Sequence, residues 1–242
     1  MADSKIALIT GAAKGIGFET CRQLGRLGYT ILLAARDETQ GAAAVKKLAG
    51  ESIAAHFVKL DTTVAADREA CYRFIEQKFG RLDVLINNAA VILDREIKPS
   101  ELSDEMLRRS FEVNFFSVVE LTQKLLPLIR KSDAGRIVNV SSNLGSLTRH
   151  SDPASDIYDV KILGYDSSKT ALNAYTVHLA HELRDTPIKV NAGHPGWIKT
   201  DMGGWDAPME VEYGARTSVR LATLPADGPT GGFFHLEETL PW

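Results

Sequence analysis

The sequence predicts an α/β fold in which a parallel sheet carries helices on both faces. Short apolar or β-branched runs alternate with longer segments of 3.6-residue periodicity along all 242 residues, which is the pattern of a doubly wound sheet. One run, residues 31–35, is apolar throughout, as a strand covered on both faces should be. The chain contains no Pro/Gly/Ser-rich linker and no fixed-period repeat, so we expect a single domain over residues 1–242.

Composition and charge exclude several classes of protein. Apolar residues make up 44% of the chain and charged residues 24%, which excludes a disordered, collagen-like or low-complexity protein. The formal net charge of −3 argues against nucleic acid or an anionic membrane as a main partner. No apolar run exceeds five residues, too few to span a bilayer. Cys21 and Cys71 fall in predicted helices and the N-terminus lacks the regions of a signal peptide, so we expect a cytoplasmic protein with reduced thiols.

Seven segments have the composition of strands and together predict a seven-stranded sheet. They are residues 6–10, 30–35, 54–60, 83–87, 136–141, 188–192 and 232–236. The helical periodicity covers residues 15–27, 38–49, 65–79, 103–131, 165–184 and 210–223.

Boundary residues support these elements. Residues 37–40 have the spacing of a capping box, and Gly80 is placed to end the third helix. Pro127 lies inside the fourth helix, where we expect a bend or a break. Residues 143–164 show no period and predict a long loop, of the kind that is functional or mobile.

Three glycines follow the first strand, in the order Gly11, Gly15 and Gly17, and a helix begins among them. Glycines at a strand-to-helix turn let the backbone approach a ligand closely, and the helix N-terminus offers free N–H groups to a phosphate. The sequence therefore predicts a dinucleotide site in a Rossmann-type fold.

The residue that ends the second strand discriminates between NAD and NADP. An acidic residue there binds the ribose 2′-hydroxyl, whereas a basic one accommodates the 2′-phosphate. Arg36 holds this position, and Lys14 in the glycine turn supplies a second positive charge. Asp37 would favour NAD, but its capping position explains it more simply. We therefore expect NADP(H).

Tyr165 and Lys169 are spaced to lie on one face of a helix. A free tyrosine has a pKa near 10, and a neighbouring ammonium favours the phenolate and so lowers that pKa. Ser142 ends the strand just upstream, and in a parallel sheet such strand ends meet the following helices where ligands bind. The three residues predict a proton-transfer site.

These motifs, taken in order, resemble the short-chain dehydrogenase/reductase family in its compact single-domain branch, and the resemblance covers nearly the whole chain. Asn114, Ser142, Tyr165 and Lys169 stand where that family has its catalytic tetrad. The resemblance implies that NADP(H) contacts Gly11, Lys14, Gly15, Ile16, Gly17, Arg36, Asp61, Thr62, Asn88, Ala89, Ala90, Tyr165, Lys169, Pro195, Gly196, Trp197, Ile198, Thr200 and Met202.

The resemblance also implies a role for each catalytic residue. Tyr165 would give a proton to a substrate carbonyl oxygen while the cofactor gives a hydride to the carbon, and Ser142 would hydrogen-bond the same oxygen. Lys169 would lower the pKa of Tyr165 and bind the nicotinamide ribose. Asn114 would hold a water that links Lys169 to solvent.

The chain departs from the family pattern at two places. Ala90 replaces a glycine, and the interval from Ser142 to Tyr165 is longer than in the most compact members. An insertion here is similar to that of the monomeric carbonyl reductases, in which the added segment covers the face through which relatives oligomerise. The sequence leaves the oligomeric state undecided between a monomer and a homo-oligomer.

The expected function is NADPH-dependent reduction of a small, apolar aldehyde or ketone, with substrate loops at residues 91–98, 143–164 and 197–213. The alternatives are a non-catalytic NADPH-sensing module and the same chemistry run as an alcohol dehydrogenase. The presence of both Tyr165 and Lys169 favours an enzyme. An epimerase or dehydratase of the longer branch is disfavoured, because the chain has no C-terminal substrate domain and the glycine spacing differs.

Other residues have weaker functional interpretations. His178, His181 and Glu182 lack the spacing of a His-Glu-x-x-His metal motif, so no metal site is expected. His150 could face substrate, although an exposed polar residue of the loop is the simpler interpretation. The remaining candidates could line the site or simply pack within the fold: His194, Met202, Trp205, Met209 and Trp242.

Overall fold

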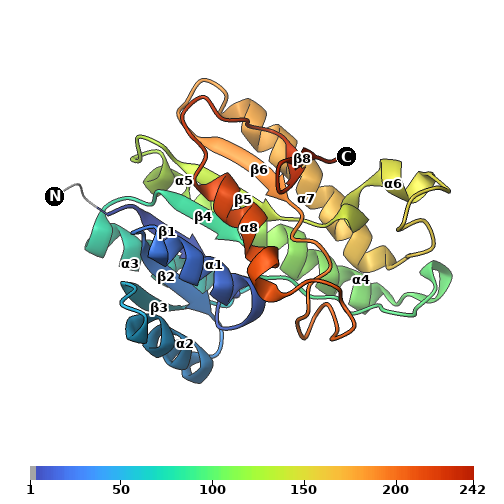
Figure 1. The fold of residues 1–242 in the computed structure, drawn as a ribbon, viewed down its shortest axis with the longest axis horizontal. Coiled ribbons are helices and arrows are strands. Elements are labelled where there is room, and N and C mark those ends of the chain that lie inside the picture. Colours follow the sequence, from blue (N-terminus) through green and yellow to red (C-terminus); the bar gives the residue numbers. More distant parts are fainter. Residues whose placement is uncertain (1–3) are drawn as a thin grey trace.

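The computed structural model describes residues 4–242, and these form one sheet of eight strands flanked by helices (Figure 1). The strand order is β3-β2-β1-β4-β5-β6-β7-β8, with the first seven in this order paired in parallel and β8 antiparallel to β7. The bounds are β1 Ile6–Ile9, β2 Thr30–Ala35, β3 Ala55–Lys59, β4 Val84–Asn87, β5 Arg136–Val140, β6 Lys189–Gly193, β7 Phe233–His235 and β8 Glu238–Thr239.

All seven predicted strands are present, which confirms the doubly wound parallel sheet. The predicted count is nevertheless wrong, because β8 adds a short antiparallel edge strand. Leu236 has a φ of 49°, which turns the chain back so that Phe234 pairs with Thr239. Two residues are too few to show an alternating pattern in the sequence.

The six predicted helical segments are also present. Their bounds, with the shorter helices between them, are α1 Gly15–Arg26, α2 Glu38–Gly50, α3 Ala65–Phe79, η1 Pro99–Glu101, α4 Asp104–Phe111, η2 Glu112–Phe116, α5 Ser117–Ile129, η3 Asn143–Gly145, α6 Leu147–Ser151, α7 Leu163–Glu182 and α8 Val211–Ala222. The expected caps are confirmed: the Asp37 carboxylate accepts a hydrogen bond from the Gln40 N–H at 2.8 Å, and Gly80 ends α3 with a φ of 72°.

The core lies on both faces of the sheet, because successive strand residues point to opposite sides. Ile6 and Leu8 of β1 pack with apolar residues of α3, α5 and α7. Ala7 and Ile9 pack with those of α1, α2 and α8 on the other face. Figure 1 shows these two helical layers with the sheet between them.

The segment predicted as one helix over residues 103–131 is divided, but not at the proline. The chain passes from α4 through the π-helical turn η2 into α5, and α5 continues through Pro127 to Ile129. Of the bend or break expected at Pro127, the break is wrong, because α5 is continuous there, and the bend stays a prediction. A proline forfeits one helical hydrogen bond, and α5 retains its helix there because Leu125, Leu128 and Ile129 are fully buried beneath it.

The predicted loop over residues 143–164 is wrong in its first part. Residues 143–145 form η3 and residues 147–151 form α6. Each begins with a serine cap: the Ser142 hydroxyl accepts from the Leu144 N–H, and the Ser146 hydroxyl accepts from the Arg149 N–H, both at 3.2 Å. Such short helices have no room for a period in the sequence, whereas residues 152–162 form neither helix nor strand.

The topology places a switch point between β1 and β4. The chain leaves β1 toward β2 on one side and enters β4 on the other, so the two strand ends diverge. Ligands of open α/β sheets bind in the crevice that forms there. No helix within residues 4–242 is both long and apolar enough to cross a membrane.

Replacing Leu125 by alanine tests the packing of α5 against the sheet. Leu125 is fully buried, so the Leu125→Ala variant should lose about 2–5 kcal/mol of unfolding free energy, measured by urea denaturation. Leu27→Ala is the matched control, because that side chain is exposed and its loss should change stability by about 0.5 kcal/mol or less. Equal losses in both variants would contradict the assignment of the core.

Candidate active site

The glycine turn after β1 lies directly against the end of β4. Gly11 has a φ of +62°, and a Cβ placed on it would lie 2.9 Å from the Cα of Ala89. A Cβ on Gly17 would lie 2.6 Å from Nδ2 of Asn88. Real side chains do not pack this closely, so both positions require glycine.

Hydrogen bonds tie the two strand ends together. The Thr10 hydroxyl accepts from the backbone N–H groups of Asn88 and Ala89 at 2.9 and 3.0 Å. The Asn88 amide donates to the backbone carbonyls of Thr10 and Gly11 at 2.8 and 3.2 Å. Asn88 and Ala89 thus have a structural task in shaping the turn, and the half-buried Ala90 follows them.

The N-terminus of α1 is free to bind an anion. Its N-cap residue, Lys14, makes no side-chain capping bond, and the first turn contains no acidic residue. The helix therefore presents uncapped N–H groups and the positive end of its dipole beside the cradle formed by Gly11 and Gly17. This arrangement fits the pyrophosphate of a dinucleotide.

The two basic residues expected near a 2′-phosphate differ in their surroundings. Arg36 is exposed at the end of β2, and within residues 4–242 it has no hydrogen-bond or ion-pair partner. Lys14 is equally exposed but forms an ion pair with Asp201 at 2.5 Å. Arg36 is therefore the group available to a phosphate, and Lys14 must leave Asp201 to join it.

Asp61 and Thr62 lie after β3, as expected. Although partial burial acts in the opposite direction, hydrogen bonds from Thr63 hold the pKa of Asp61 below its usual value, so its carboxylate is ionised. The Thr62 hydroxyl accepts a hydrogen bond from the Ser117 hydroxyl at 3.0 Å and is turned into the protein. Only the backbone of Thr62 remains to contact a ligand.

Tyr165 lies in the first turn of α7 and is only 7% exposed. Its hydroxyl lies near that of Ser142, which comes from the end of β5. Burial raises the pKa of Tyr165 to about 12, while the interaction with Ser142 acts in the opposite direction. The structure thus brings two of the predicted catalytic residues together.

Lys169 is 2% exposed and lies one turn further along α7. Its ammonium nitrogen donates to the carbonyl of Val140 at 2.7 Å and lies 5.6 Å from the centre of the Tyr165 ring. Burial lowers the pKa of Lys169 to about 7. Burial is the largest cause of the pKa shift of both groups, and the expected effect of Lys169 on the pKa of Tyr165 stays a prediction.

Asn114 is fully buried in the π-helical turn η2. Its side-chain amide accepts from the Val91 N–H and donates to the Val91 carbonyl, both at 2.9 Å, and donates to the Ser168 hydroxyl at 3.0 Å. Both amide protons are therefore used within the protein. A water between Lys169 and solvent could therefore bind Asn114 only at an oxygen, as a donor.

The segment over residues 195–202 lies beside the glycine turn, where a Cβ on Gly15 would lie 3.4 Å from the Thr200 side chain. Ile198 is buried, whereas Trp197 is exposed and donates its ring N–H to the Gly203 carbonyl at 2.7 Å. Arg95, from the loop after β4, donates to the carbonyl of Met202. Together with the Lys14–Asp201 pair, this contact attaches the segment to both sides of the site.

Sequence reasoning missed a row of buried hydrogen bonds that connects α7 to β5. Beyond the bond from Lys169 to Val140, the Ser141 hydroxyl donates to the Asn173 side chain at 2.6 Å. The Asn139 amide donates to the Thr176 hydroxyl at 2.9 Å. Asn173 and Thr176 follow Lys169 at helical spacing, and that spacing was the one signal that could have indicated them.

The weaker candidates are resolved by their contacts. Trp242 stacks on Phe233 with ring centres 5.5 Å apart, so it anchors the end of the chain. His150 is not an exposed loop residue, because it lies in α6 and its ring contacts the Leu144 carbonyl at 2.9 Å. Residues 4–242 contain no cluster of three His, Cys, Asp or Glu side chains arranged to hold a metal.

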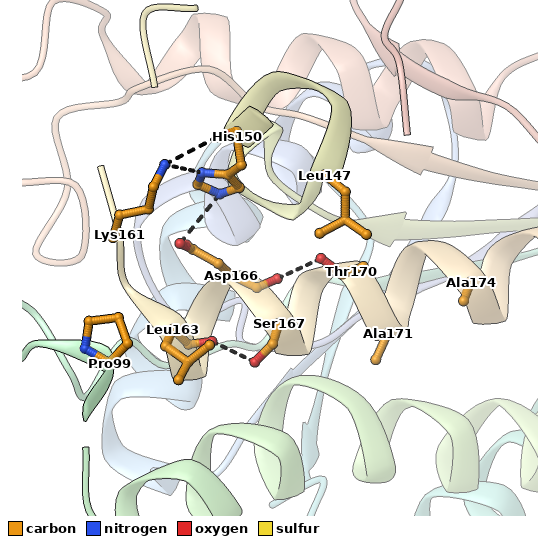
Figure 2. Close-up of a pocket in the computed structure, with 10 residues that line it drawn as sticks. All are labelled: Pro99, Leu147, His150, Lys161, Leu163, Asp166, Ser167, Thr170, Ala171 and Ala174. Atoms are coloured by element: carbon orange, nitrogen blue, oxygen red, sulfur yellow. Dashed lines mark hydrogen bonds and ion pairs between the residues drawn. The ribbon is translucent and has the colours of Figure 1, made fainter. Parts of the chain in front are cut away.

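A groove of about 470 Å³ lies on the outer face of α7 (Figure 2). Its lining includes Leu147, Leu163, Ala171 and Ala174, and it includes none of the four predicted catalytic residues. The groove and the candidate active site are therefore separate features on the same helix.

Comparisons with known proteins place the chain among short-chain dehydrogenases. A family model described as short chain dehydrogenase matches residues 5–210. The chain is 33% identical to short-chain dehydrogenase/reductase 1 of Saponaria officinalis over 296 residues, covering 100% of this chain and 97% of that protein. It is 33% identical to carbonyl reductase (NADPH) 1 of Sus scrofa over 279 residues, covering 99% and 95%. A crystal structure of NADPH-bound carbonyl reductase from chicken fatty liver matches with a TM-score of 0.87, at 26% identity and 100% coverage of both chains.

The raised pKa of Tyr165 can be tested by titration. Because burial holds the phenol in its protonated form, the difference spectrum between the wild type and Tyr165→Phe should show no phenolate band below about pH 10. Ser142→Ala should move the onset to still higher pH, since it removes an interaction that lowers the pKa. A phenolate band that grows near neutral pH would contradict this description of the site.

Proposed function

Because this chain belongs to the short chain dehydrogenase family of oxidoreductases, we propose that it is an NADPH-dependent carbonyl reductase with Tyr165 as the proton donor. The observation that carries the proposal is the buried group of Ser142, Tyr165 and Lys169 at the ends of β5 and α7, on the same sheet edge as the glycine turn. We propose further that all 242 residues act as one dinucleotide-binding domain.

Each residue of the site has its own role in carbonyl reduction. Reduced nicotinamide, when bound, supplies the hydride that reaches the carbonyl carbon. Ser142 donates a hydrogen bond to the carbonyl oxygen and stabilises the charge that develops there. The Tyr165 hydroxyl gives its proton to the same oxygen, which completes the alcohol.

The pKa values of the two α7 residues suit reduction rather than oxidation. A phenol with a pKa of about 12 is protonated at neutral pH, which is the form a proton donor needs. Alcohol oxidation would need the phenolate instead. Lys169, with a pKa of about 7, can release and take up a proton at neutral pH and so return one to Tyr165.

The choice of NADPH rests on Arg36. The guanidinium at the end of β2 is exposed and has no partner among residues 4–242, and its planar fork matches a phosphate group. Two relatives point the same way, since carbonyl reductase (NADPH) 1 of Sus scrofa and the NADPH-bound chicken enzyme carry this cofactor in their descriptions.

The substrate we propose is an apolar aldehyde, ketone or quinone. Residues 197–205 expose three large apolar side chains, those of Trp197, Met202 and Trp205, in the segment whose Asp201 pairs with Lys14 of the glycine turn. Exposed side chains of this kind, grouped beside a polar reaction centre, are typical of a site that binds apolar molecules.

Removing the proton donor tests the mechanism. Tyr165→Phe should lower kcat for NADPH-dependent reduction by about 10²- to 10⁴-fold, because only the proton-transfer group is lost, while the Kd for NADPH stays unchanged. The measurement is NADPH oxidation against a panel of ketones, aldehydes and quinones, with fluorescence titration for the Kd.

Tyr175→Phe is the matched control, since it removes a hydroxyl from the same helix away from Ser142. Its kcat should equal that of the wild type. Near-normal turnover by Tyr165→Phe would reject the catalytic role, and a wild type that binds NADPH but reduces nothing would favour the sensing module.

The cofactor assignment is tested at Arg36. Arg36→Ala should raise the Kd for NADPH about ten- to a hundredfold and leave the Kd for NADH unchanged, because hydrogen bonds to charged groups contribute about 1.5–3 kcal/mol. Arg130→Ala, an exposed arginine that pairs with Glu182, should change neither Kd. Equal or better binding of NADH by the wild type would overturn the assignment.

A further inference from the structure

The side chain of the N-cap residue does not cap the catalytic helix α7. Its N-cap residue is Ile162, whose side chain cannot accept a hydrogen bond. Two carboxylates bind the first N–H groups instead. Asp166 of α7 itself accepts from the Ile162 N–H at 2.9 Å, and Asp94, seventy residues away in the sequence, accepts from the Gly164 N–H at 2.5 Å.

We propose that Asp94 is a positioning residue for Tyr165, acting as a cap that a distant loop supplies to the catalytic helix. Tyr165 directly follows Gly164, so the hydrogen bond to Asp94 fixes the turn of helix from which the phenol projects. This inference rests on the proposed function of Tyr165 as the proton donor.

The contact between Asp94 and Gly164 is close and dry. Asp94 is only 1% exposed, and no cation forms an ion pair with it among residues 4–242. A Cβ on Gly164 would lie 3.0 Å from Oδ2 of Asp94 and 3.1 Å from Oγ of Ser110. The glycine therefore leaves the space that the carboxylate occupies, and the positive end of the α7 dipole lies beside that carboxylate. Its Oδ2 accepts from the Gly164 N–H, whereas its buried Oδ1 has no hydrogen-bond partner among residues 4–242.

The loop that carries Asp94 is itself attached to the catalytic residues. Asn114 binds both backbone polar groups of Val91, three residues before Asp94. The same amide donates to the Ser168 hydroxyl, which in turn donates to the backbone carbonyl of Tyr165 at 2.6 Å. Asn114 and Asp94 thus connect one loop to α7 on either side of Tyr165.

Asp166 is the second carboxylate of the cap, and burial acts with its negative neighbour Asp94 to raise its pKa to about 7. Figure 2 shows Asp166 directed toward His150 of α6, with a distance of 3.4 Å between the imidazole Nε2 and the carboxylate. Lys161 contacts the other ring nitrogen of His150 at 3.3 Å. Asp166 therefore contacts His150 as well as the Ile162 N–H, so its substitution would disturb α6 too. The Asp94 side chain binds the Gly164 N–H, so its substitution tests the cap of α7 more directly.

The test compares two substitutions at one position. Asp94→Ala removes the acceptor and should lower kcat for NADPH-dependent carbonyl reduction at least about tenfold, because small displacements of a catalytic group are costly. The Kd for NADPH should not change. Asp94→Asn keeps an acceptor oxygen for the Gly164 N–H and should restore kcat to within about threefold of the wild type.

Ser103→Ala is the matched control, because it removes the cap of α4, where the serine hydroxyl accepts from the Met106 N–H at 3.2 Å. It should lower the Tm about as much as Asp94→Ala but leave kcat unchanged. Hydrogen exchange gives a second readout: the amides at the start of α7 should exchange faster in Asp94→Ala and at the wild-type rate in Asp94→Asn.

The outcomes separate this inference from the proposed function. Equal amide exchange rates at the start of α7 in the wild type and in Asp94→Ala would show that Asp94 does not cap the helix. A kcat that stays low in Asp94→Asn would contradict the cap as well. An unchanged kcat in a folded Asp94→Ala would overturn the positioning role. A wild type that reduces no carbonyl would instead overturn the proposed function, on which the catalytic part of the inference depends.

Discussion

The buried hydrogen bonds between α7 and β5 determine where the chemistry of this protein takes place. Apolar contacts alone would allow a helix to slide or rotate on a sheet, because dispersion and hydrophobic burial are not directional. The bond from Lys169 to Val140 and the two polar contacts that follow it permit only one register. In that register Tyr165 meets Ser142 at the sheet edge, beside the glycine turn.

Burial has an electrostatic consequence that spacing along a helix does not reveal. Two groups one turn apart suggest that the ammonium should acidify the phenol, since opposite charges attract. The site is instead dry enough to disfavour both charged forms, so the phenol keeps its proton and the ammonium holds its proton weakly. A protonated donor beside a group that exchanges protons at neutral pH is suited to reduction.

The loops around the site fall into two kinds. The contacts of Lys14 with Asp201 and of Arg95 with Met202, which hold the segment over residues 195–202, are exposed, so water weakens them. The contacts of Asp94 and Asn114 are buried and keep the base of the neighbouring loop in place. Buried hydrogen bonds therefore hold the loop after β4 beside Tyr165, whereas the segment over residues 195–202 meets Lys14 and Arg95 through exposed contacts.

The sequence by itself determined the alternation of strands and helices, the seven parallel strands, the glycine turn and the family, because each depends on residues close together in the chain. It failed where the signal was too short, as in β8 and α6, or where burial outweighed a local rule, as at Pro127. Two features emerge only from the folded chain: the protonated state of Tyr165 and the cap that Asp94 supplies to α7. Both depend on what Asp94, Val140 and Ser142 place around α7, and residues so far apart leave no periodic trace in a single sequence.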